Sequence, residues 1–312
     1  MSRRRAWAEL LRLPALFTVP GDALSGAVAA GGRPGPRTLL AIGSSLCLYE
    51  AGMALNDWAD RTEDAVERPH RPLPSGRIRP SSALTAACAL TAAGLGLAAG
   101  AGRPALAVAT PLAATVWAYD LGLKHTPVGP VAMAAARGLD HLLGAAATTG
   151  RPRAALSSAA LLGTHTLAVT AVSRRETQGG TSLPPLAALG ATAVLARVVA
   201  AGRRREEAAA RGGPSLRGGH SQRDSLWGGP TPAQALRTAL AVTYAVTAGR
   251  PYTHAALNPS PPLTQRAVGG GIRATIPLQA ALAARAGAGL TALAIAALAP
   301  LGRRYAKKVS IT

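Results

Sequence analysis

The chain has 312 residues, of which 48% are hydrophobic and only 15% are charged. Soluble proteins carry about 25% charged residues, so this composition excludes a typical soluble enzyme and favours a membrane protein. The formal net charge is +20, but no basic stripe with interleaved aromatic residues accompanies it, which argues against nucleic acid as a partner and favours contact with anionic membrane lipids.

Apolar segments approaching twenty residues recur along almost the whole chain and predict membrane-spanning helices. The fold class expected from them is all-α, a polytopic transmembrane helical bundle in a single domain covering 1–312. Gly269–Gly271 and Arg273 weaken the ninth segment as a simple spanning helix. The segments fall roughly at 11–31, 37–55, 81–100, 104–123, 128–149, 154–172, 184–202, 233–249, 264–283 and 286–302.

The polar loops between these segments fall into a consistent pattern. Met1–Trp7 is a short basic leader without a convincing cleavage site after it, so we expect a cytoplasmic N-terminus. Counting crossings from there places the loops 56–80, 124–127 and 173–183 on the cytoplasmic side together. These three loops hold the candidate chemistry.

The segment 203–230 is rich in Arg, Gly, Ser and Pro and predicts a disordered insertion. Simple counting places it outside the cell, which conflicts with the positive-inside rule. Either the topology changes after residue 202 or the rule fails there. The basic tail 303–308 prefers the cytoplasm, which favours ten crossings over nine.

The loop after the second apolar segment contains an amide and several carboxylates at regular spacing. On a helix turning about 100° per residue, five oxygen-bearing side chains share an arc of about 100°: Asn56, Asp57, Asp60, Asp64 and Glu67. Mg²⁺ prefers such oxygen ligands, usually one or two carboxylates together with substrate phosphates. The alternative is a solvated acidic turn whose carboxylates pair with nearby arginines.

Guanidinium groups follow this acidic stretch on a proline-stiffened segment, His70–Ile78, and Arg71 among them suits phosphate oxygens. The 23 residues NDWADRTEDAVERPHRPLPSGRI, positions 56–78, resemble the first motif of the UbiA superfamily, NDxxDxxxD followed by RPLPSG. The superfamily consists of intramembrane prenyltransferases.

The resemblance implies about nine helices (eight to ten) around a central cavity, and Mg²⁺ as cofactor. One of the ten apolar segments, 233–249 or 264–283, is therefore expected to be short, re-entrant or interfacial. It also implies transfer of an isoprenyl group from a prenyl diphosphate to a lipophilic small-molecule acceptor. Lys124 matches the family's basic loop after the fourth helix, where the alternative is a lysine reaching the membrane surface from a helix end. Tyr119 matches a position near the acceptor or the cation, and an interfacial aromatic explains it equally well.

The family's second acidic motif, approximately DxxDxEGD, is eroded in this chain. Ser173 replaces its first Asp, Glu176 its second, Gln178 its Glu and Gly180 its last Asp. Three interpretations remain open. Arg174 and Arg175 bind diphosphate while Glu176 holds a single metal ion, Asp120 supplies a missing ligand, or catalysis is lost and the protein is a non-catalytic prenyl-lipid binder or transport partner.

These interpretations define the candidate site. The candidate catalytic residues are Asn56, Asp57, Asp60, Asp64 and Glu176; the candidate metal ligands are Asn56, Asp60, Asp64 and Glu176; the candidate substrate-binding residues are Arg71, Tyr119, Lys124, Arg174 and Arg175. The degenerate SRxExxGG loop is similar to a bacterial subgroup described as EboC-like. That resemblance implies an integral protein of the bacterial cytoplasmic (inner) membrane, with its active site facing the cytoplasm.

Ionisable residues also occur inside the apolar segments. Arg137 and Asp140 stand three residues apart, and we expect either a mutual ion pair facing the bundle interior or a role in the site. His141 and His165 are interpreted as hydrogen-bonded core residues. Among other enzyme classes, the pattern of CDP-alcohol phosphotransferases is absent, and no paired discontinuous helices suggest a transporter.

Overall fold

The computed structural model describes residues 3–174, 180–201 and 231–309, and throughout this part of the chain the secondary structure is helical, without a strand. The segment 203–230 and the residues Arg175 and Glu176 lie outside the described residues. The α-helices and 3₁₀ helices are α1 (Arg3–Leu10), η1 (Leu13–Thr18), α2 (Pro20–Ala29), α3 (Pro36–Ala59), α4 (Arg61–Glu67), α5 (Pro80–Ala101), α6 (Arg103–Leu121), η2 (Leu123–His125), α7 (Gly129–Thr149), η3 (Pro152–Ala155), α8 (Leu156–Ser173), α9 (Leu183–Ala201), α11 (Pro232–Leu257), α12 (Pro261–Arg285) and α13 (Gly289–Val309).

Prolines begin many of these helices, which is why the helix ends can be read from the sequence. Pro20, Pro36, Pro80, Pro232 and Pro261 each occupy the first turn of a helix. A proline there loses no hydrogen bond, since the first N–H groups of a helix have no partner within it, and its fixed φ already suits the helix.

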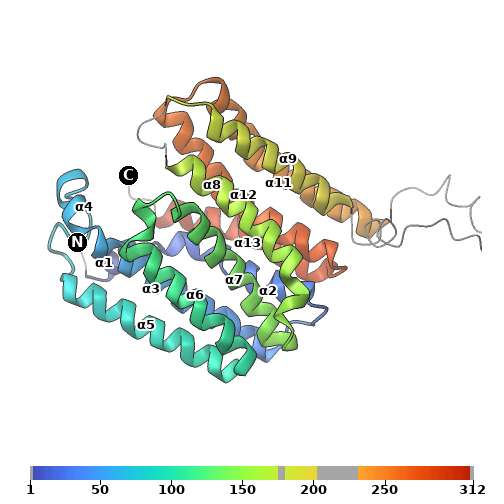
Figure 1. The fold of residues 1–312 in the computed structure, drawn as a ribbon, viewed down its shortest axis with the longest axis horizontal. Coiled ribbons are helices and arrows are strands. Elements are labelled where there is room, and N and C mark those ends of the chain that lie inside the picture. The colour runs from blue at the N-terminus through green and yellow to red at the C-terminus, as the bar shows by residue number, and fades with distance from the viewer. Residues whose placement is uncertain (1–2, 175–179, 202–230, 310–312) are drawn as a thin grey trace, which may run out of the picture.

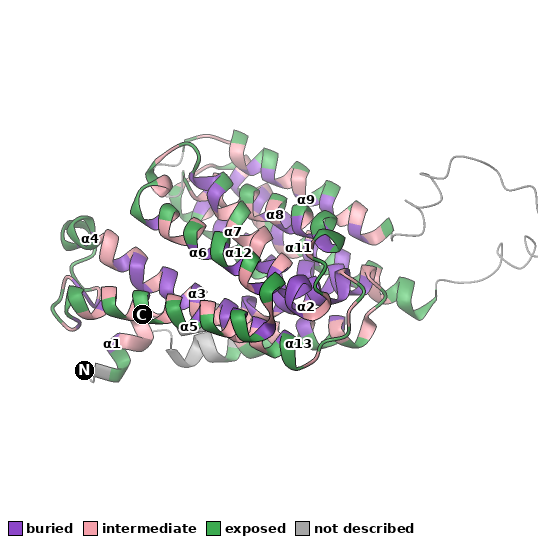
Figure 2. Cartoon of the chain, turned by 60° about the horizontal axis from the view of Figure 1, so that its bottom comes forward, coloured by how far each residue is buried: buried purple, intermediate pink, exposed green. Residues whose placement is uncertain are grey.

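The long helices run back and forth along one common direction and form a bundle (Figure 1). Four stretches are long and apolar enough to cross a membrane by length and composition: Pro36–Ala59, Pro80–Ala101, Pro152–Ser173 and Leu183–Ala201. Two of them, on α5 and α9, lie mostly at the outside of the bundle, where only 22% and 28% of the residues are buried. Figure 2 shows the buried residues gathered on the inward faces. An apolar outer surface of this kind needs lipid around it, so the chain is an integral membrane protein.

Small residues let the inner helices approach closely, as the abundance of Gly and Ala predicts. A β-carbon at Gly26 on α2 would overlap the carbonyl oxygen of His141 on α7, and one at Gly144 would overlap that of Ala23. The backbones of α2 and α7 therefore touch. This contact packs the short helix α2 into the middle of the bundle.

The expected polytopic all-α bundle is confirmed, but the position of its short element was predicted wrongly. We expected 233–249 or 264–283 to be short or re-entrant, whereas α11 and α12 are continuous over 26 and 25 residues. The short pass is the N-terminal one, where the 3₁₀ helix η1 precedes a ten-residue α2. Gly269–Gly271 does not break α12, because it lies against other helices: a β-carbon at Gly270 would meet Pro251 on α11.

One end of the bundle gathers the polar loops. The helix α4, the connection between α6 and α7, and the end of α8 lie at this end, together with α1 (Figure 1). Arg77, in the loop after α4, makes a two-pronged ion pair with Glu9 on α1, at 2.6 Å and 3.1 Å. These hydrogen bonds raise the pKa of Arg77 above its usual value, and they tie the loop to α1.

Candidate active site

The first acidic motif does not form one uninterrupted helix. Asn56 and Asp57 lie in the last turn of α3, Asp60 stands at the junction with φ −86° and ψ 5°, and Asp64 belongs to α4. The chain bends at Asp60, although its N–H still bonds to the carbonyl oxygen of Asn56. Our assumption of a single shared arc is therefore wrong in detail. The side chains separate into three neighbouring groups.

The first group is an ion-pair network of Asp57 and Asp64, which are only 4% and 2% exposed. Arg71 bridges the two carboxylates, at 2.7 Å from Asp64 and 3.6 Å from Asp57. Arg68 also contacts Asp64, and Arg12 contacts Asp57 at 3.1 Å. Because both carboxylates are buried and paired, Arg71 is held where its remaining donors can meet an anion.

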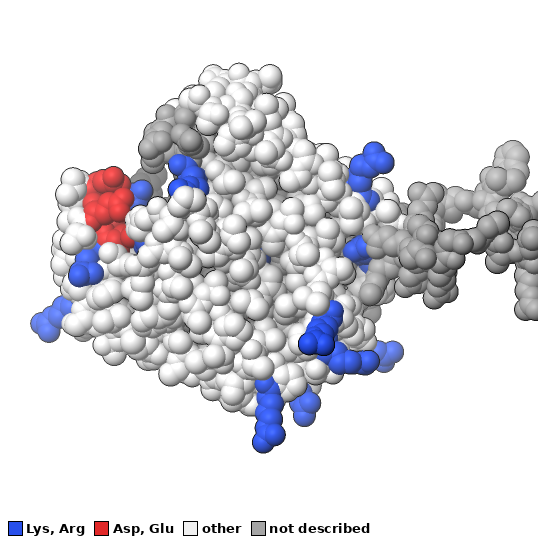
Figure 3. Space-filling model, viewed as in Figure 1, with Lys and Arg blue, Asp and Glu red and all other residues white. Residues whose placement is uncertain are grey.

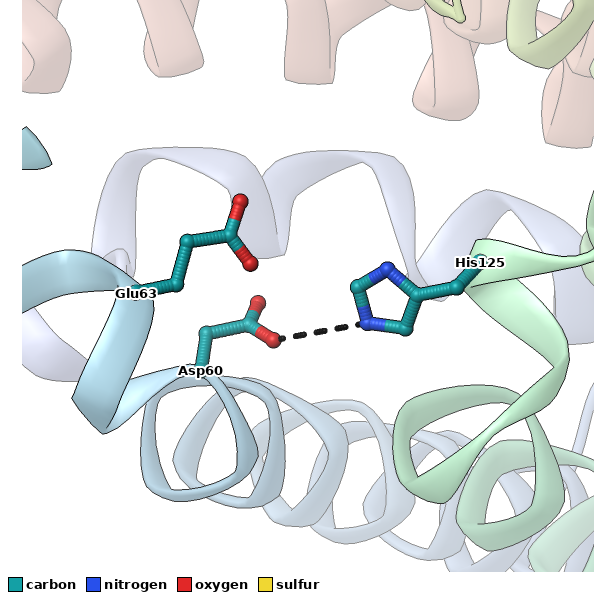
Figure 4. A group of neighbouring side chains, drawn as sticks. All are labelled: Asp60, Glu63 and His125. Atoms are coloured by element: carbon teal, nitrogen blue, oxygen red, sulfur yellow. Dashed lines mark ion pairs between the residues drawn. The ribbon is translucent and has the colours of Figure 1, made fainter.

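The second group surrounds Asp60. Lys124 places its ammonium 2.5 Å from Asp60, and His125 lies 3.9 Å away. Oxygen atoms of Asp60 and Glu63 and a ring nitrogen of His125 all lie within 4.8 Å of one another (Figure 4). The basic loop between α6 and α7 thus meets the acidic loop, as the sequence predicts. These three side chains could hold a divalent cation.

The third group faces a cavity inside the bundle. Asn56 donates a hydrogen bond from its side-chain amide to Asp120 on α6, at 3.1 Å. Asn56, Tyr119 and Asp120 all line the cavity, and Asp120 is only 5% exposed. This contact leaves the amide oxygen of Asn56 and the second oxygen of Asp120 available as ligands. The residue that we weighed as a substitute ligand therefore lies beside the first motif.

The second loop contributes less to what the structure describes. Ser173 lines the cavity at the end of α8. Arg174 donates a hydrogen bond to the carbonyl oxygen of Thr126, in the loop that also carries Lys124. Arg174 is thereby brought to the same end of the bundle as Asp60, while the positions of Arg175 and Glu176 fall outside the described residues.

The cavity has a volume of about 440 Å³ and reaches from the polar end into the middle of the bundle. Helices α3, α6, α7, α8 and α12 form its walls. Polar residues surround its mouth, apolar residues cover its middle, and polar residues return at its floor. The middle is lined mainly by apolar residues: Leu48, Met53, Leu112, Val116, Met133, Ala136, Val169, Val268 and Ile272. Tyr49, Thr166 and Thr170 also line it, and the two threonine hydroxyls donate to backbone carbonyls of their own helix.

The floor is built from buried polar side chains that bond to one another. Arg137 pairs with Asp22 on α2 at 2.5 Å, and Gln279 on α12 donates to the other oxygen of Asp22 at 2.7 Å. Asp140 accepts a hydrogen bond from Ser45 on α3. The predicted mutual ion pair between Arg137 and Asp140 is therefore wrong, because Asp22 from another helix offers Arg137 the closer carboxylate.

The two intramembrane histidines are hydrogen-bonded, as we expected. His141 lies between Ser25 and Ser158, at 3.1 Å and 2.7 Å. His165 contacts the Tyr244 hydroxyl and the carbonyl oxygen of Gly271, and one side of it lines the cavity floor.

The composition of the mouth suits a magnesium–diphosphate pair. Carboxylate and amide oxygens lie beside guanidinium and ammonium groups, and Figure 3 shows the acidic side chains gathered over α4 with basic ones next to them. Oxygen donors with space for phosphates are the ligand set that Mg²⁺ prefers. Arginines supply the forked donors that phosphates accept. The side chains present therefore fit the cofactor that the first motif implies.

Arg12, at the mouth of the cavity, was not among the site residues predicted from the sequence. Its backbone has φ 47° and ψ 44°, in the left-handed region that residues other than glycine seldom adopt. It lines the mouth and pairs with Asp57, 45 residues along the chain. Nothing in the local sequence indicates which distant carboxylate Arg12 meets.

Comparison with known proteins identifies relatives among enzymes of lipid synthesis. Digeranylgeranylglyceryl phosphate synthase of Natronomonas pharaonis is 31% identical over 170 residues, which is 54% of this chain and 61% of that protein. The enzyme of the same name from Methanopyrus kandleri is 36% identical over 148 residues, 46% of this chain and 53% of that protein. The matched region thus spans less than two thirds of the length of these curated relatives.

Solved structures share the fold. A structure of digeranylgeranylglyceryl phosphate synthase superposes with a TM-score of 0.60 at 16% identity, covering 93% of this chain and all of that one. A UbiA homologue from Archaeoglobus fulgidus, bound to DMAPP and Mg²⁺, has a TM-score of 0.57 at 17% identity, over 93% of this chain and 99% of that one. The model of the UbiA prenyltransferase family matches residues 16–257, so the chain belongs to this family.

Proposed function

We propose that the protein transfers an isoprenyl group from a prenyl diphosphate to a lipophilic acceptor, with Mg²⁺ as cofactor. The observation that carries this proposal is the meeting of oxygen ligands and cationic side chains at the mouth of a cavity with apolar walls. Relatives whose names state prenyl-lipid synthesis, and a homologue bound to DMAPP and Mg²⁺, support the same reaction.

The mouth would hold the metal ion and the diphosphate with different side chains. Asn56, with Asp120 beside it, and Asp60 would hold Mg²⁺. Asp64, whose carboxylate pairs with Arg71 and Arg68, and Glu176 remain proposed further ligands. When bound, Mg²⁺ supplies positive charge that stabilises the departing diphosphate. The diphosphate oxygens would accept hydrogen bonds from a set of cationic side chains: Arg12, Arg71, Lys124, Arg174 and Arg175.

Catalysis would follow from this placement. The bond between the first carbon of the prenyl group and the bridging oxygen breaks, and its electron pair leaves with the diphosphate. Arg71 and Lys124, held by Asp64 and Asp60, are oriented in advance to stabilise that charge. The allylic cation would form beside Tyr119, which lines the cavity and whose ring attracts positive charge. The nucleophilic atom of the acceptor then bonds to the first carbon, and its proton passes to the released diphosphate.

The walls of the cavity protect this cation from water. Their middle level consists mainly of Leu, Val, Met and Ile side chains, which offer no hydrogen bonds to a water molecule. A lipophilic acceptor would enter from the bilayer, because the outer surface of the helices is apolar. Exclusion of water keeps hydrolysis from competing with transfer.

We further propose that the protein belongs to the bacterial EboC-like subgroup and works in the cytoplasmic membrane with its mouth toward the cytoplasm. The eroded loop SRxExxGG supports the subgroup. Single cysteines introduced at Ser75 and Pro127, in a C47A/C88A background, should react with a membrane-impermeant reagent from the cytoplasmic side. A cysteine at Arg151, at the opposite end of the bundle, should react only from the other side, and the reverse result would place the mouth outside.

The function is tested by comparing lipids from cells with the intact gene, without it, and with Asp60→Asn. We expect a prenylated lipid that disappears in the last two strains and persists with Glu67→Gln, a matched loss of charge on exposed α4. The alternative function is a non-catalytic prenyl-lipid binder, which the eroded second loop favours. It would be established if deletion changed no lipid and the purified protein bound prenyl diphosphate without consuming it.

A further inference from the structure

The floor of the cavity is polar, whereas its walls are mainly apolar, and this difference bears on the length of the prenyl donor. Ser45, Arg137, Asp140, His165 and Thr275 line the deep end. The apolar level lies above them, and the mouth with Asn56 and Asp120 lies above that level. A prenyl chain whose diphosphate is held at the mouth therefore passes along apolar side chains and then meets charged and hydroxyl groups.

The floor is also fixed in place. Asp22 is fully buried and is shared by Arg137 and Gln279. Asp140 is held by Ser45, and His165 by Tyr244 and Gly271. Moving these side chains aside would leave buried charges without partners, which is strongly unfavourable. Because their polar atoms already bond to one another, the floor acts as a barrier to an apolar chain rather than as a binding site for a polar one.

The depth of the apolar level follows from helix geometry. Asn56 and Ser45 are eleven residues apart on α3, and Ser173 and His165 are eight residues apart on α8. At a rise of 1.5 Å per residue, mouth and floor are separated by roughly 12–16 Å. An extended isoprene unit advances by four chain bonds, roughly 5 Å for C–C bonds of about 1.5 Å. The space between mouth and floor therefore accommodates two or three units.

From this geometry we infer that the donor is a short prenyl diphosphate, geranyl or farnesyl, and that the polar floor excludes the fourth unit of a geranylgeranyl chain. The inference rests on the proposed function, since it assumes that the diphosphate is bound at the mouth. It separates this chain from the relatives whose name states a digeranylgeranyl product, and it assigns the role of setting the donor length to Ser45, Arg137 and Asp140.

The test is Mg²⁺-dependent binding of dimethylallyl, geranyl, farnesyl and geranylgeranyl diphosphates to the full chain in lipid nanodiscs. Each unit that enters the apolar level should lower Kd at least about tenfold. We expect this gain to end at geranyl or farnesyl and the geranylgeranyl compound to bind no more tightly. A further tenfold gain for geranylgeranyl diphosphate would overturn the inference, because its chain would then leave the cavity sideways into the bilayer.

Two variants move the barrier in opposite directions. The Kd of each diphosphate for a variant is divided by its Kd for the wild type, so that partition of the diphosphate into lipid cancels. The double variant Ser45→Gly/Asp140→Ala removes floor atoms and leaves Arg137 paired with Asp22, so geranylgeranyl diphosphate should gain at least about tenfold over farnesyl diphosphate. Ala136→Phe, on the wall above the floor, should weaken farnesyl more than dimethylallyl diphosphate. Ala135→Phe, its exposed neighbour on α7, serves as the control.

The outcomes separate the inference from the function on which it rests. If none of the four diphosphates binds in the presence of Mg²⁺, the proposed function fails. If all bind and both cavity variants leave the order of the four Kd values unchanged, only the length assignment fails. Should the double variant not fold, Ala136→Phe with its control still decides the question.

Discussion

At the mouth and at the floor of the cavity, arginines meet aspartates in different surroundings. Arg12 at the mouth is 41% exposed on its side chain, and its partner Asp57 is 6% exposed. Arg137 at the floor is 19% exposed, and Asp22 not at all. An exposed arginine can exchange its carboxylate partner for a ligand at small cost, whereas an arginine in a fully buried pair cannot. The same two residue types thus give a reactive site at one level and a rigid barrier at the other.

The largest effect should come from breaking the floor pair. Arg137→Gln leaves the buried Asp22 without its cationic partner, and we expect the free energy of unfolding to fall by about 3–5 kcal/mol. Asp22→Asn/Arg137→Gln, which removes both charges, should recover most of this loss. Unfolding in mixed detergent micelles measures both variants. Equal destabilisation by the single and the double variant would show that the pair is not the source of the stability.

A smaller effect is expected from Asp120→Asn at the mouth. The substitution keeps the shape of the side chain and its contact with Asn56, but it removes a carboxylate that would serve the metal ion. Mg²⁺-dependent affinity for geranyl diphosphate should fall about a hundredfold. The free energy of unfolding should change by no more than about 1 kcal/mol. Ala118→Leu, exposed on the same helix, is the control. Affinity unaffected by the loss of Asp120 would remove this residue from the site.

Sequence reasoning found the parts of this site that are close together in the chain. Asn56, Asp60 and Asp64 share a motif, and the following loop carries Arg71, so spacing alone indicated a site. Contacts between distant residues were not predictable in this way. Asp120 lies 64 positions from Asn56, and Asp22 lies 115 from Arg137.

The reason is physical. Periodicity reports which face of a helix is apolar, and the composition reports the bundle, but neither specifies which helices become neighbours. Gly26 and Gly144 each let α2 and α7 come into backbone contact. This contact decides that Arg137 meets Asp22 rather than Asp140, which is three residues away. The proline-initiated helix ends, by contrast, are local features and were close to the predicted segments.

Substitution of Arg12 compares the ion pair of the mouth with that of the floor. Arg12→Gln should weaken Mg²⁺-dependent binding of geranyl diphosphate by about tenfold, the value of one charged hydrogen bond. The same change should alter the free energy of unfolding by no more than about 1 kcal/mol, since the ion pair is partly exposed. A loss of stability as large as that of Arg137→Gln would contradict the distinction between mouth and floor.

The smallest effect is expected at the eroded second loop. Arg174 is exposed and contacts the carbonyl oxygen of Thr126 at the rim of the mouth. Arg174→Ala should weaken binding of geranyl diphosphate only a few-fold, and the effect should shrink further as salt is raised, because an exposed charge is screened. A hundredfold loss, independent of salt, would instead make this loop as important as the first.

The connection between α9 and α11 offers a site for fusing a second domain to the protein. The end of α9 and the start of α11 lie at the end of the bundle opposite α4 (Figure 1). Arg237 donates to the carbonyl oxygen of Ala200 at 2.9 Å, which holds the two helix ends together. A rigid soluble domain fused between these helices would protrude from the membrane far from the mouth. It would give electron microscopy a particle large enough to align, while leaving the substrate end of the bundle free.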